Sequence, residues 1–191
     1  MGKLILILGG ARSGKSRYAE QRARESGGEN VLYVATSEMK DEEMRRRVEK
    51  HRSMRPPGWT TLEAPLKILS ALHEMKWTER VVLLDCVTFL VSNYLLQAAG
   101  PEDDPFNSPS ADPFDAKIEA EVVAEVEGLI SYMDEQDVEM LVVSNEVGLG
   151  IVPPYELGRA YRDVLGRVNQ ILARHADEVL YLVAGLPMRL K

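Results

Sequence analysis

The chain has 191 residues, of which 45% are hydrophobic and 28% charged, as in an ordinary globular domain. Its net charge of −7 argues against a general nucleic-acid-binding protein. A single cysteine, Cys86, excludes an internal disulfide and favours a reducing compartment such as the cytoplasm. No apolar run approaches the roughly 20 residues of a membrane span, and the first is too short for a signal peptide.

The first half of the chain alternates short apolar runs with stretches of helical character. The apolar run at residues 3–8 predicts a buried strand, and the polar stretch at 16–26 predicts a helix. By the same criteria we expect strands at 31–36, 59–63 and 81–85, and helices at 41–52, 66–75 and 87–99. Pro56, Pro57 and Gly58 stop the helix expected at 41–52 from continuing.

The second half begins with residues 100–113, which contain four prolines and an acidic run, so we expect an exposed, mobile loop. Asp112 followed by Pro113 predicts the start of a helix that runs to about Gln136. Beyond it we expect a strand at 140–144, a long helix at 154–176, a strand at 179–183 and a short antiparallel edge strand at 188–191.

Residues 9–16 read Gly-Gly-Ala-Arg-Ser-Gly-Lys-Ser, the phosphate-binding pattern G-x-x-x-x-G-K-[ST] between a predicted strand and a predicted helix. Glycines allow backbone angles that a Cβ forbids, so the loop can direct N–H groups at phosphate oxygens. A chance match in a glycine-rich turn is disfavoured by this context. We expect Lys15 to reach the β- and γ-phosphates and the Ser16 hydroxyl to hold Mg²⁺. The predicted nucleotide-binding residues of the loop are Gly9, Gly10, Ala11, Arg12, Ser13, Gly14, Lys15 and Ser16.

Strands and helices alternate along the whole chain, which predicts an α/β fold with a mostly parallel sheet covered on both faces. We expect a P-loop NTPase-like three-layer sandwich with about six parallel strands plus one antiparallel edge strand, in a single domain of residues 1–191. Ligands of such sheets bind beyond the carboxyl ends of the strands. Thr36, Glu63, Asp85 and the pair Asn145-Glu146 all fall at such ends.

Asp85 closes an apolar strand far downstream of the phosphate loop. This position matches a Walker-B carboxylate, which holds Mg²⁺ directly or through water, so we predict a metal site at Ser16 and Asp85. The alternative is that Asp85 caps the helix beginning at Val87. The neighbouring Cys86 is expected to be a small packed residue.

Residues 45–55 contain six Lys or Arg and a single Glu. Arg47, His51 and Arg55 are four residues apart, so they share one face if a helix extends that far. Neighbouring arginines disfavour the charged form of His51, and a neutral imidazole is a nucleophile. Spacing alone is compatible with three interpretations of this segment: a histidine that attacks a phosphate, a lid whose arginines bind a triphosphate, or a solvated basic helix.

Two further features are suited to ligand contact. Glu63 ends a short strand, and its carboxylate could accept hydrogen bonds from the N1–H and N2–H₂ edge of guanine, although a surface glutamate is the simpler interpretation. The glycine-containing stretch 144–153 suits a substrate-contacting loop or a plain connector. His73 and His175 lie in ordinary helical patterns and are expected to be structural.

Taken together, these motifs resemble the bifunctional adenosylcobinamide kinase/adenosylcobinamide-phosphate guanylyltransferase family of cobalamin biosynthesis. The resemblance runs in order over nearly the whole chain, with residues 100–113 outside it. It is carried by residues 9–16, Tyr33-Val-Ala-Thr-Ser37, Arg47-x-x-x-His51-x-x-x-Arg55-Pro56, Trp59-x-x-x-Glu63, Asn145-Glu146-Val-Gly-x-Gly-Ile-Val-Pro153, Arg162-Asp163-x-x-Gly166-Arg167-Val-Asn169-Gln170 and residues 176–179.

The resemblance implies two reactions: phosphorylation of adenosylcobinamide, then transfer of GMP from GTP to adenosylcobinamide phosphate with release of pyrophosphate. It also implies ATP and GTP as substrates, a guanylylated His51 and a homotrimer. The family's GTP-contacting positions map onto the loop 9–16 and onto Val34, Ala35, Thr36, Arg52, Ser53, Met54, Arg55, Glu63 and Asp85. The alternatives are another small-molecule P-loop kinase and a nucleotide-gated regulatory protein.

Overall fold

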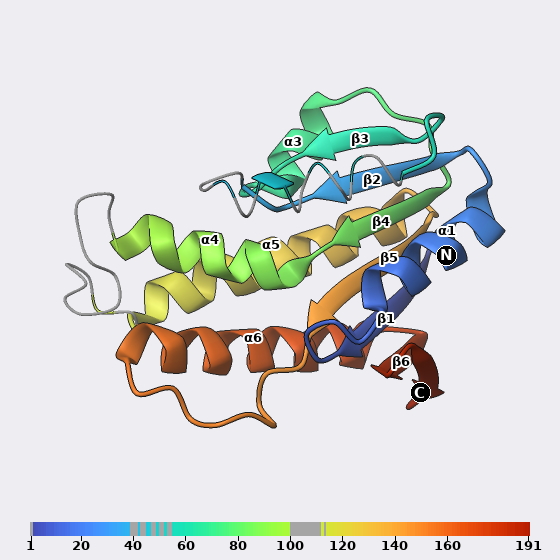
Figure 1. Ribbon diagram of the computed structural model, residues 1–191. Helices are drawn as coiled ribbons and strands as arrows, with labels where there is room; N and C mark the ends of the chain where they lie inside the picture. The colour runs from blue at the N-terminus through green and yellow to red at the C-terminus, as the bar shows by residue number, and fades with distance from the viewer. Residues whose placement is uncertain are drawn as a thin grey trace.

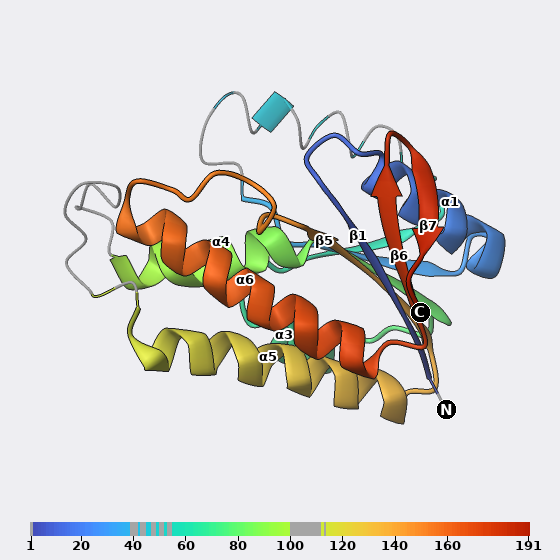
Figure 2. The same cartoon turned by 90° about the horizontal axis from the view of Figure 1, so that it is seen from below.

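A computed structural model of the protein describes residues 2–38, 42, 45, 46, 49, 52, 55–99, 112 and 114–191. These residues contain a seven-stranded sheet in the order β3-β2-β4-β5-β1-β6-β7. All neighbouring strands are parallel except β6 and β7, which form an antiparallel pair at one edge. Helix α1 lies on one face of the sheet, and α3, α4, α5 and α6 lie on the other (Figures 1 and 2). The predicted mostly parallel sandwich with an antiparallel edge strand is confirmed.

The bounds of the elements follow the predicted alternation closely. The strands are β1 (Lys3–Gly9), β2 (Val31–Ala35), β3 (Thr60–Glu63), β4 (Val81–Asp85), β5 (Glu139–Asn145), β6 (Glu178–Val183) and β7 (Leu186–Arg189). The helices are α1 (Lys15–Gly27), α3 (Ile68–Glu74), α4 (Val87–Ala99), α5 (Ala116–Glu135) and α6 (Glu156–His175).

The central strands are apolar along their length because helices cover them on both sides. In β1, every residue from Leu4 to Leu8 is buried, and the strand is hydrogen-bonded to β5 on one side and β6 on the other. Even-numbered side chains such as Leu6 pack under α4, α5 and α6, while odd-numbered ones such as Ile7 pack under α1. Helix α1 approaches the sheet through Ala19 and Ala23, whose short side chains let the phosphate loop sit directly on the strand ends.

Two predicted starts of elements are wrong. The antiparallel strand begins at Leu186, not Met188, because a turn at Ala184 and Gly185, both with positive φ, already reverses the chain. Helix α5 begins at Ala116, after a turn in which the Asp112 carboxylate accepts from the Phe114 N–H. Its N-cap is Asp115, whose side chain accepts from the Lys117 N–H.

Two predicted segments cannot be compared with the structure over their full length. The helix expected at 41–52 and the loop expected at 100–113 fall largely outside the described residues. Of the helices that the structure does describe, none is long and apolar enough to cross a membrane.

Candidate nucleotide-binding site

The phosphate loop joins β1 to α1 and depends on glycine at both ends. A Cβ at Gly9 would lie 2.6 Å from Ser13 Oγ and 2.7 Å from the Leu182 carbonyl oxygen. Gly14 has a φ of +95°, in the left-handed region, and immediately precedes the first residue of α1. The loop is closed by hydrogen bonds from the Ser13 N–H to the Gly10 carbonyl and from the Gly185 N–H to the Ser13 carbonyl. The loop therefore holds its backbone close to the start of a helix, where N–H groups favour anions.

Lys15 is buried in this loop, with 7% of its surface exposed. Its ammonium donates to the Gly10 carbonyl at 2.7 Å, across the loop. Burial lowers the pKa of Lys15 below its usual value, and the negative charge of Asp85 acts in the opposite direction. A desolvated ammonium that faces the loop interior is suited to bind an anionic phosphate.

Asp85 receives hydrogen bonds from two hydroxyl groups that belong to different elements. Ser16, in the first turn of α1, donates to Oδ1 at 3.3 Å, and Tyr33, in β2, donates to Oδ2 at 2.8 Å. The predicted pairing of Ser16 with Asp85 is therefore present as a direct contact. Both groups are oxygen donors, the kind that Mg²⁺ prefers.

The end of β4 is anchored to the end of β2 by Thr36. This fully buried side chain donates to the Cys86 carbonyl at 2.7 Å and accepts from the Cys86 N–H at 2.9 Å. Cys86 is buried, as predicted, and burial followed by the charge of Asp85 raises the pKa of its thiol to about 12. On the same side of the site, the Asn93 amide in α4 donates to the carbonyls of Thr36 and Pro65.

The end of β5 is held next to the phosphate loop by α6. Asn169 accepts from the Ser144 hydroxyl at 2.6 Å and donates to the Asn145 carbonyl at 3.0 Å. One residue further on, the Glu146 N–H donates to the Gly9 carbonyl at 3.1 Å. The stretch that follows Ser144 is therefore fixed at its base to the first residue of the phosphate loop.

The end of the basic segment reaches the same edge of the sheet from the side of β2 and β3. Arg52 forms an ion pair with Glu63 at the end of β3. The Arg55 guanidinium lies over the ring of Tyr33, with Cζ 3.7 Å from the ring centroid. Because Tyr33 also bonds Asp85, Arg55 lies one side chain away from the carboxylate predicted to hold a metal.

The predicted site residues divide into three groups. The phosphate loop, Asp85, Glu63, Arg52 and Arg55 lie along the carboxyl edge of the sheet. The side chains of Val34, Ala35 and Thr36 are buried at the end of β2, so a ligand can meet that stretch only through the backbone. His51, Arg47, Ser53 and Met54 lie outside the described residues.

Sequence reasoning assigned no role to Tyr33, Thr88, Asn93 or Asn169. Tyr33 and Asn169 belong to the family motifs. Periodicity does not show, however, that their side chains form hydrogen bonds with residues at the ends of neighbouring strands. Asn93 gave a usable signal: it lies in a mostly apolar helix, and a buried amide needs hydrogen-bond partners. Thr88 accepts from the Asn145 N–H at 2.9 Å, which no local pattern indicates.

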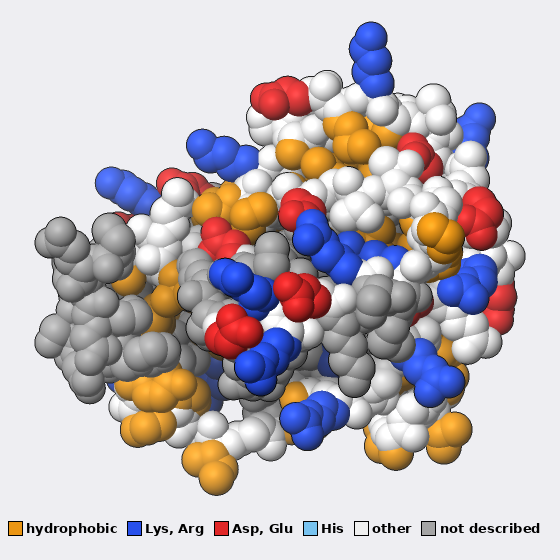
Figure 3. Space-filling view, turned by 45° about the horizontal axis from the view of Figure 1, so that its top comes forward, with side chains coloured by type: hydrophobic (Ala, Val, Ile, Leu, Met, Phe, Trp, Pro, Cys, Tyr) orange, Lys and Arg blue, Asp and Glu red, His pale blue; other side chains and the backbone are white. Residues whose placement is uncertain are grey.

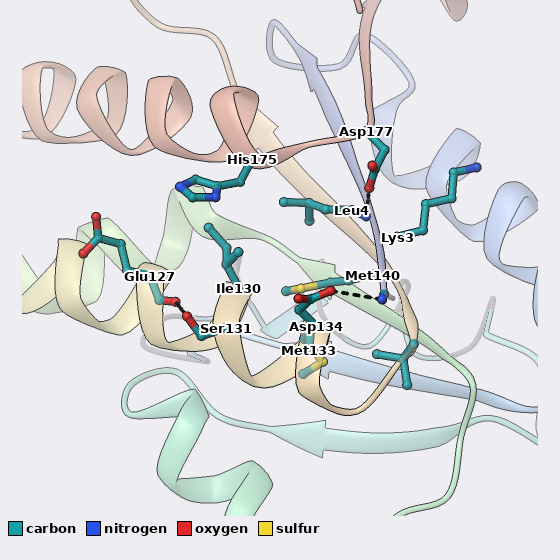
Figure 4. Close-up of a pocket in the computed structure, with 12 residues that line it drawn as sticks. Lys3, Leu4, Glu127, Ile130, Ser131, Met133, Asp134, Met140, His175 and Asp177 are labelled. Atoms are coloured by element: carbon teal, nitrogen blue, oxygen red, sulfur yellow. Dashed lines mark hydrogen bonds between the residues drawn. The ribbon is translucent and has the colours of Figure 1, made fainter.

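A hollow away from the candidate site lies at the opposite, amino-terminal edge of the sheet. This cavity of about 510 Å³ is bordered by α5, the end of α6 and the first residues of β1 (Figure 4). Two of its acidic groups already serve the fold, because Asp134 accepts from the Gly2 N–H and Asp177 accepts from the Leu4 N–H. Lys3 points away from the hollow (Figure 4). The polar groups of this cavity therefore do not form a second candidate for the chemistry.

The strand order, the glycine-dependent loop and the carboxylate beside Ser16 define an α/β protein of the P-loop nucleotide-binding class. A KaiC-like protein from Pyrococcus horikoshii OT3 has a similar fold, with a TM-score of 0.50 at 14% identity over 94% of this chain and 70% of that chain.

The chain belongs to the family described as cobinamide kinase / cobinamide phosphate guanyltransferase, which it matches over residues 5–190. It is 42% identical to the bifunctional adenosylcobalamin biosynthesis protein CobU of Escherichia coli (strain K12), over 98% of this chain and 99% of that protein. It is also 42% identical to the bifunctional adenosylcobalamin biosynthesis protein CobP of Pseudomonas aeruginosa, over 97% of this chain and 96% of that protein. The family resemblance drawn from the motifs is confirmed.

Proposed function

We propose that this protein phosphorylates adenosylcobinamide and then transfers GMP from GTP to adenosylcobinamide phosphate, giving adenosylcobinamide-GDP and pyrophosphate. The observation that carries the proposal is the meeting of Lys15, Ser16 and Asp85 with Arg52 and Arg55 at one edge of the sheet. The family description names both activities, and this edge offers the groups that each requires.

In the kinase step, a nucleoside triphosphate, ATP or GTP, lies with its phosphates on the loop 9–16. The backbone N–H groups at the start of α1 and the Lys15 ammonium bind the β- and γ-phosphate oxygens, where negative charge increases in the transition state. The hydroxyl oxygen of the aminopropanol arm attacks the γ-phosphorus. The bond from the γ-phosphorus to the bridging oxygen breaks, the nucleoside diphosphate leaves, and the hydroxyl proton passes to solvent water.

The donor set at this edge fits Mg²⁺. Ser16 Oγ and the Asp85 carboxylate are 3.3 Å apart and supply hard oxygen ligands. No cluster of three or more His, Cys, Asp or Glu side chains in the described part of the chain is arranged for a metal. This agrees with the usual mode for Mg²⁺, in which one or two protein groups act together with substrate phosphates. When bound, the ion neutralises phosphate charge, and Ser16 and Asp85 are the residues that would hold it.

In the transferase step, we assign the nucleophile to His51. An imidazole nitrogen attacks the α-phosphorus of GTP, pyrophosphate leaves, and a phosphoramidate to GMP forms. A phosphate oxygen of adenosylcobinamide phosphate then attacks the same phosphorus, and the nitrogen–phosphorus bond breaks. The placement of Arg52, the next residue in the chain, at the edge with Glu63 supports this assignment. Glu63 is also the group that we propose for recognition of the guanine edge.

The experiment is covalent labelling with GTP that carries a radiolabelled α-phosphate. We expect the native protein to retain label that is lost in acid and kept in base, as a phosphoramidate requires. His51→Ala should retain none, because no other nucleophile is proposed. The matched control is His73→Ala, since the His73 ring packs edge-on against Tyr132, with centroids 4.6 Å apart, and has no proposed role. Full labelling of His51→Ala would remove this residue from the mechanism.

We further propose that the protein is a homotrimer and acts in the cytoplasm, where nucleoside triphosphates are supplied. Self-association is supported by exposed aliphatic side chains, among them Leu149 and Ile151, which are 85% and 96% exposed. Hydrophobic groups also protrude along the lower edge of the face drawn in Figure 3.

A further inference from the structure

Tyr33 connects the two parts of the candidate site. It lies in the middle of β2, with 1% of its surface exposed, and its ring packs on the face of the sheet covered by α1. In the strand register Tyr33 is opposite Leu83, so Asp85 is its diagonal neighbour on the same face. A diagonal position is within reach of an aromatic side chain, and the hydroxyl bonds Asp85 Oδ2 at 2.8 Å.

The hydroxyl of Tyr33 restricts the orientation of the Asp85 carboxylate. Ser16 bonds the other oxygen, Oδ1, at the longer distance of 3.3 Å. One carboxylate oxygen is thus held by a buried donor, while the other faces the phosphate loop. A phenol has an ordinary pKa of about 10, so the Tyr33 hydroxyl carries its proton at neutral pH and acts as the donor.

The ring face of Tyr33 contacts a different group. Arg55 stacks on it at 3.7 Å, and the buried Nε of Arg55 has no hydrogen-bond partner among the described residues. The Tyr33 ring is therefore a direct contact of this guanidinium. The Trp59 ring also lies near Tyr33, with the two ring centroids 6.4 Å apart, and its Nε1 donates a hydrogen bond to the Gly28 carbonyl.

We propose that Tyr33 is a positioning residue that orients Asp85 through its hydroxyl and holds Arg55 in place through its ring. One buried side chain then aligns the carboxylate used with the phosphate loop and the arginine that ends the basic segment. The inference rests on the proposed function, because it takes Asp85 as a metal-holding group and Arg55 as a phosphate-binding group.

The test measures how strongly Mn²⁺, used as a probe, improves binding of a GTP analogue with a methylene bridge between the α- and β-phosphates. This analogue cannot label the protein, so binding is separated from chemistry. We expect Tyr33→Phe to bind the metal-free analogue within about twofold of the native protein, because the ring remains. Its improvement by Mn²⁺ should be roughly tenfold smaller, as for the loss of other groups that orient a metal ligand.

A second variant tests the ring. Tyr33→Met keeps an apolar side chain of adaptable shape but lacks an aromatic ring, so Arg55 loses its stacking contact. We expect weaker binding of the metal-free analogue as well as the smaller improvement by Mn²⁺. The matched control is Tyr132→Phe, which removes a hydroxyl from α5 on the other face of the sheet and should change neither quantity.

Two results would overturn the proposal: an unchanged improvement by Mn²⁺ in Tyr33→Phe, or a metal-free affinity in Tyr33→Met equal to that of Tyr33→Phe. If Tyr33→Met does not fold, Tyr33→Phe decides alone, since it preserves the packing. No cobinamide is used in these titrations. A native protein that binds the analogue but transfers no phosphate or GMP would contradict the proposed function without deciding the role of Tyr33.

Discussion

Lys15 carries a positive charge at a place where burial disfavours that charge. Its pKa is lowered in the free protein, chiefly by desolvation, and the neighbouring Asp85 offsets only part of this effect. Bound phosphates add negative charge beside the ammonium and must raise its pKa. Binding in the pH range between the two pKa values therefore takes up a proton.

The expected result is a triphosphate affinity that falls as the pH rises through the lowered pKa of Lys15, by up to tenfold per pH unit. For the free protein the sign is opposite, since the unfolded chain binds more protons in this range and the free energy of unfolding rises with pH. Calorimetric titrations in two buffers of different ionisation enthalpy count the protons taken up. Lys15→Arg is the control, because a guanidinium stays protonated there. Equal pH slopes for the two proteins would contradict this account.

Residue types and spacing were enough to choose most residues of the candidate site, because the motifs that define it are local in the sequence. The glycines, Lys15 and Ser16 are consecutive, and Asp85 ends a strand that is apolar enough to be recognised alone. The links between distant segments could not be predicted in this way. The bond from Tyr33 to Asp85 and that from Thr36 to Cys86 depend on β2 lying beside β4. Hydrophobic periodicity predicts where strands occur in the sequence but not their order in the sheet. Contacts between residues of neighbouring strands therefore could not be predicted.

At the scale of elements, α6 does more than cover the sheet. Its buried Asn169 satisfies the Ser144 hydroxyl and the Asn145 carbonyl at the point where β5 ends. The same strand end reaches the phosphate loop through the Glu146 N–H and the Gly9 carbonyl. The helix thereby fixes the distance between the β5 end and the loop.

Asn169→Ala should lower the free energy of unfolding by about 1–3 kcal/mol, since it leaves buried polar groups of Ser144 and Asn145 without partners. Urea unfolding measures this change. Arg174→Ala, an exposed position near the end of the same helix, should stay within about 0.5 kcal/mol of the native protein. An Asn169→Ala protein as stable as the native one would show that these hydrogen bonds make no net contribution to the free energy of unfolding.

The boundaries of helices and strands were less predictable than their types, because several neighbouring residues can start or end an element. Asp112 and Pro113 carry the residue types of a helix start, but Asp115 offers an equally good cap three residues later, and the structure uses it. At the other end of the chain, the positive φ of Ala184 and Gly185 reverses the chain early enough for the edge strand to begin at Leu186, before the expected residue 188. In each case competing local signals of similar strength were present, and the packing of the whole sheet selected one.

At the scale of the molecule, exposed aliphatic side chains of the described residues gather at two places. One is the connection between β5 and α6, where Leu149, Ile151 and Val152 are exposed. The other is the edge hairpin, where Val183 pairs with Leu186, and Met188 follows on the same face. Water contact with so many aliphatic side chains is unfavourable, by roughly 25 cal/mol for each Å² of apolar surface. Their burial between copies of the chain would favour the proposed homotrimer.

We expect a solution mass of about three times the 21.4 kDa of one chain in sedimentation equilibrium. Ile151→Glu and Leu186→Glu, made separately, place a charge in each apolar region and should shift the mass toward that of one chain, because a buried unpaired carboxylate is costly. Lys117→Glu, an exposed change on α5, is the control for the added negative charge. A native mass of one chain would contradict the homotrimer. A native trimer that neither glutamate weakens would instead place the interface elsewhere on the surface.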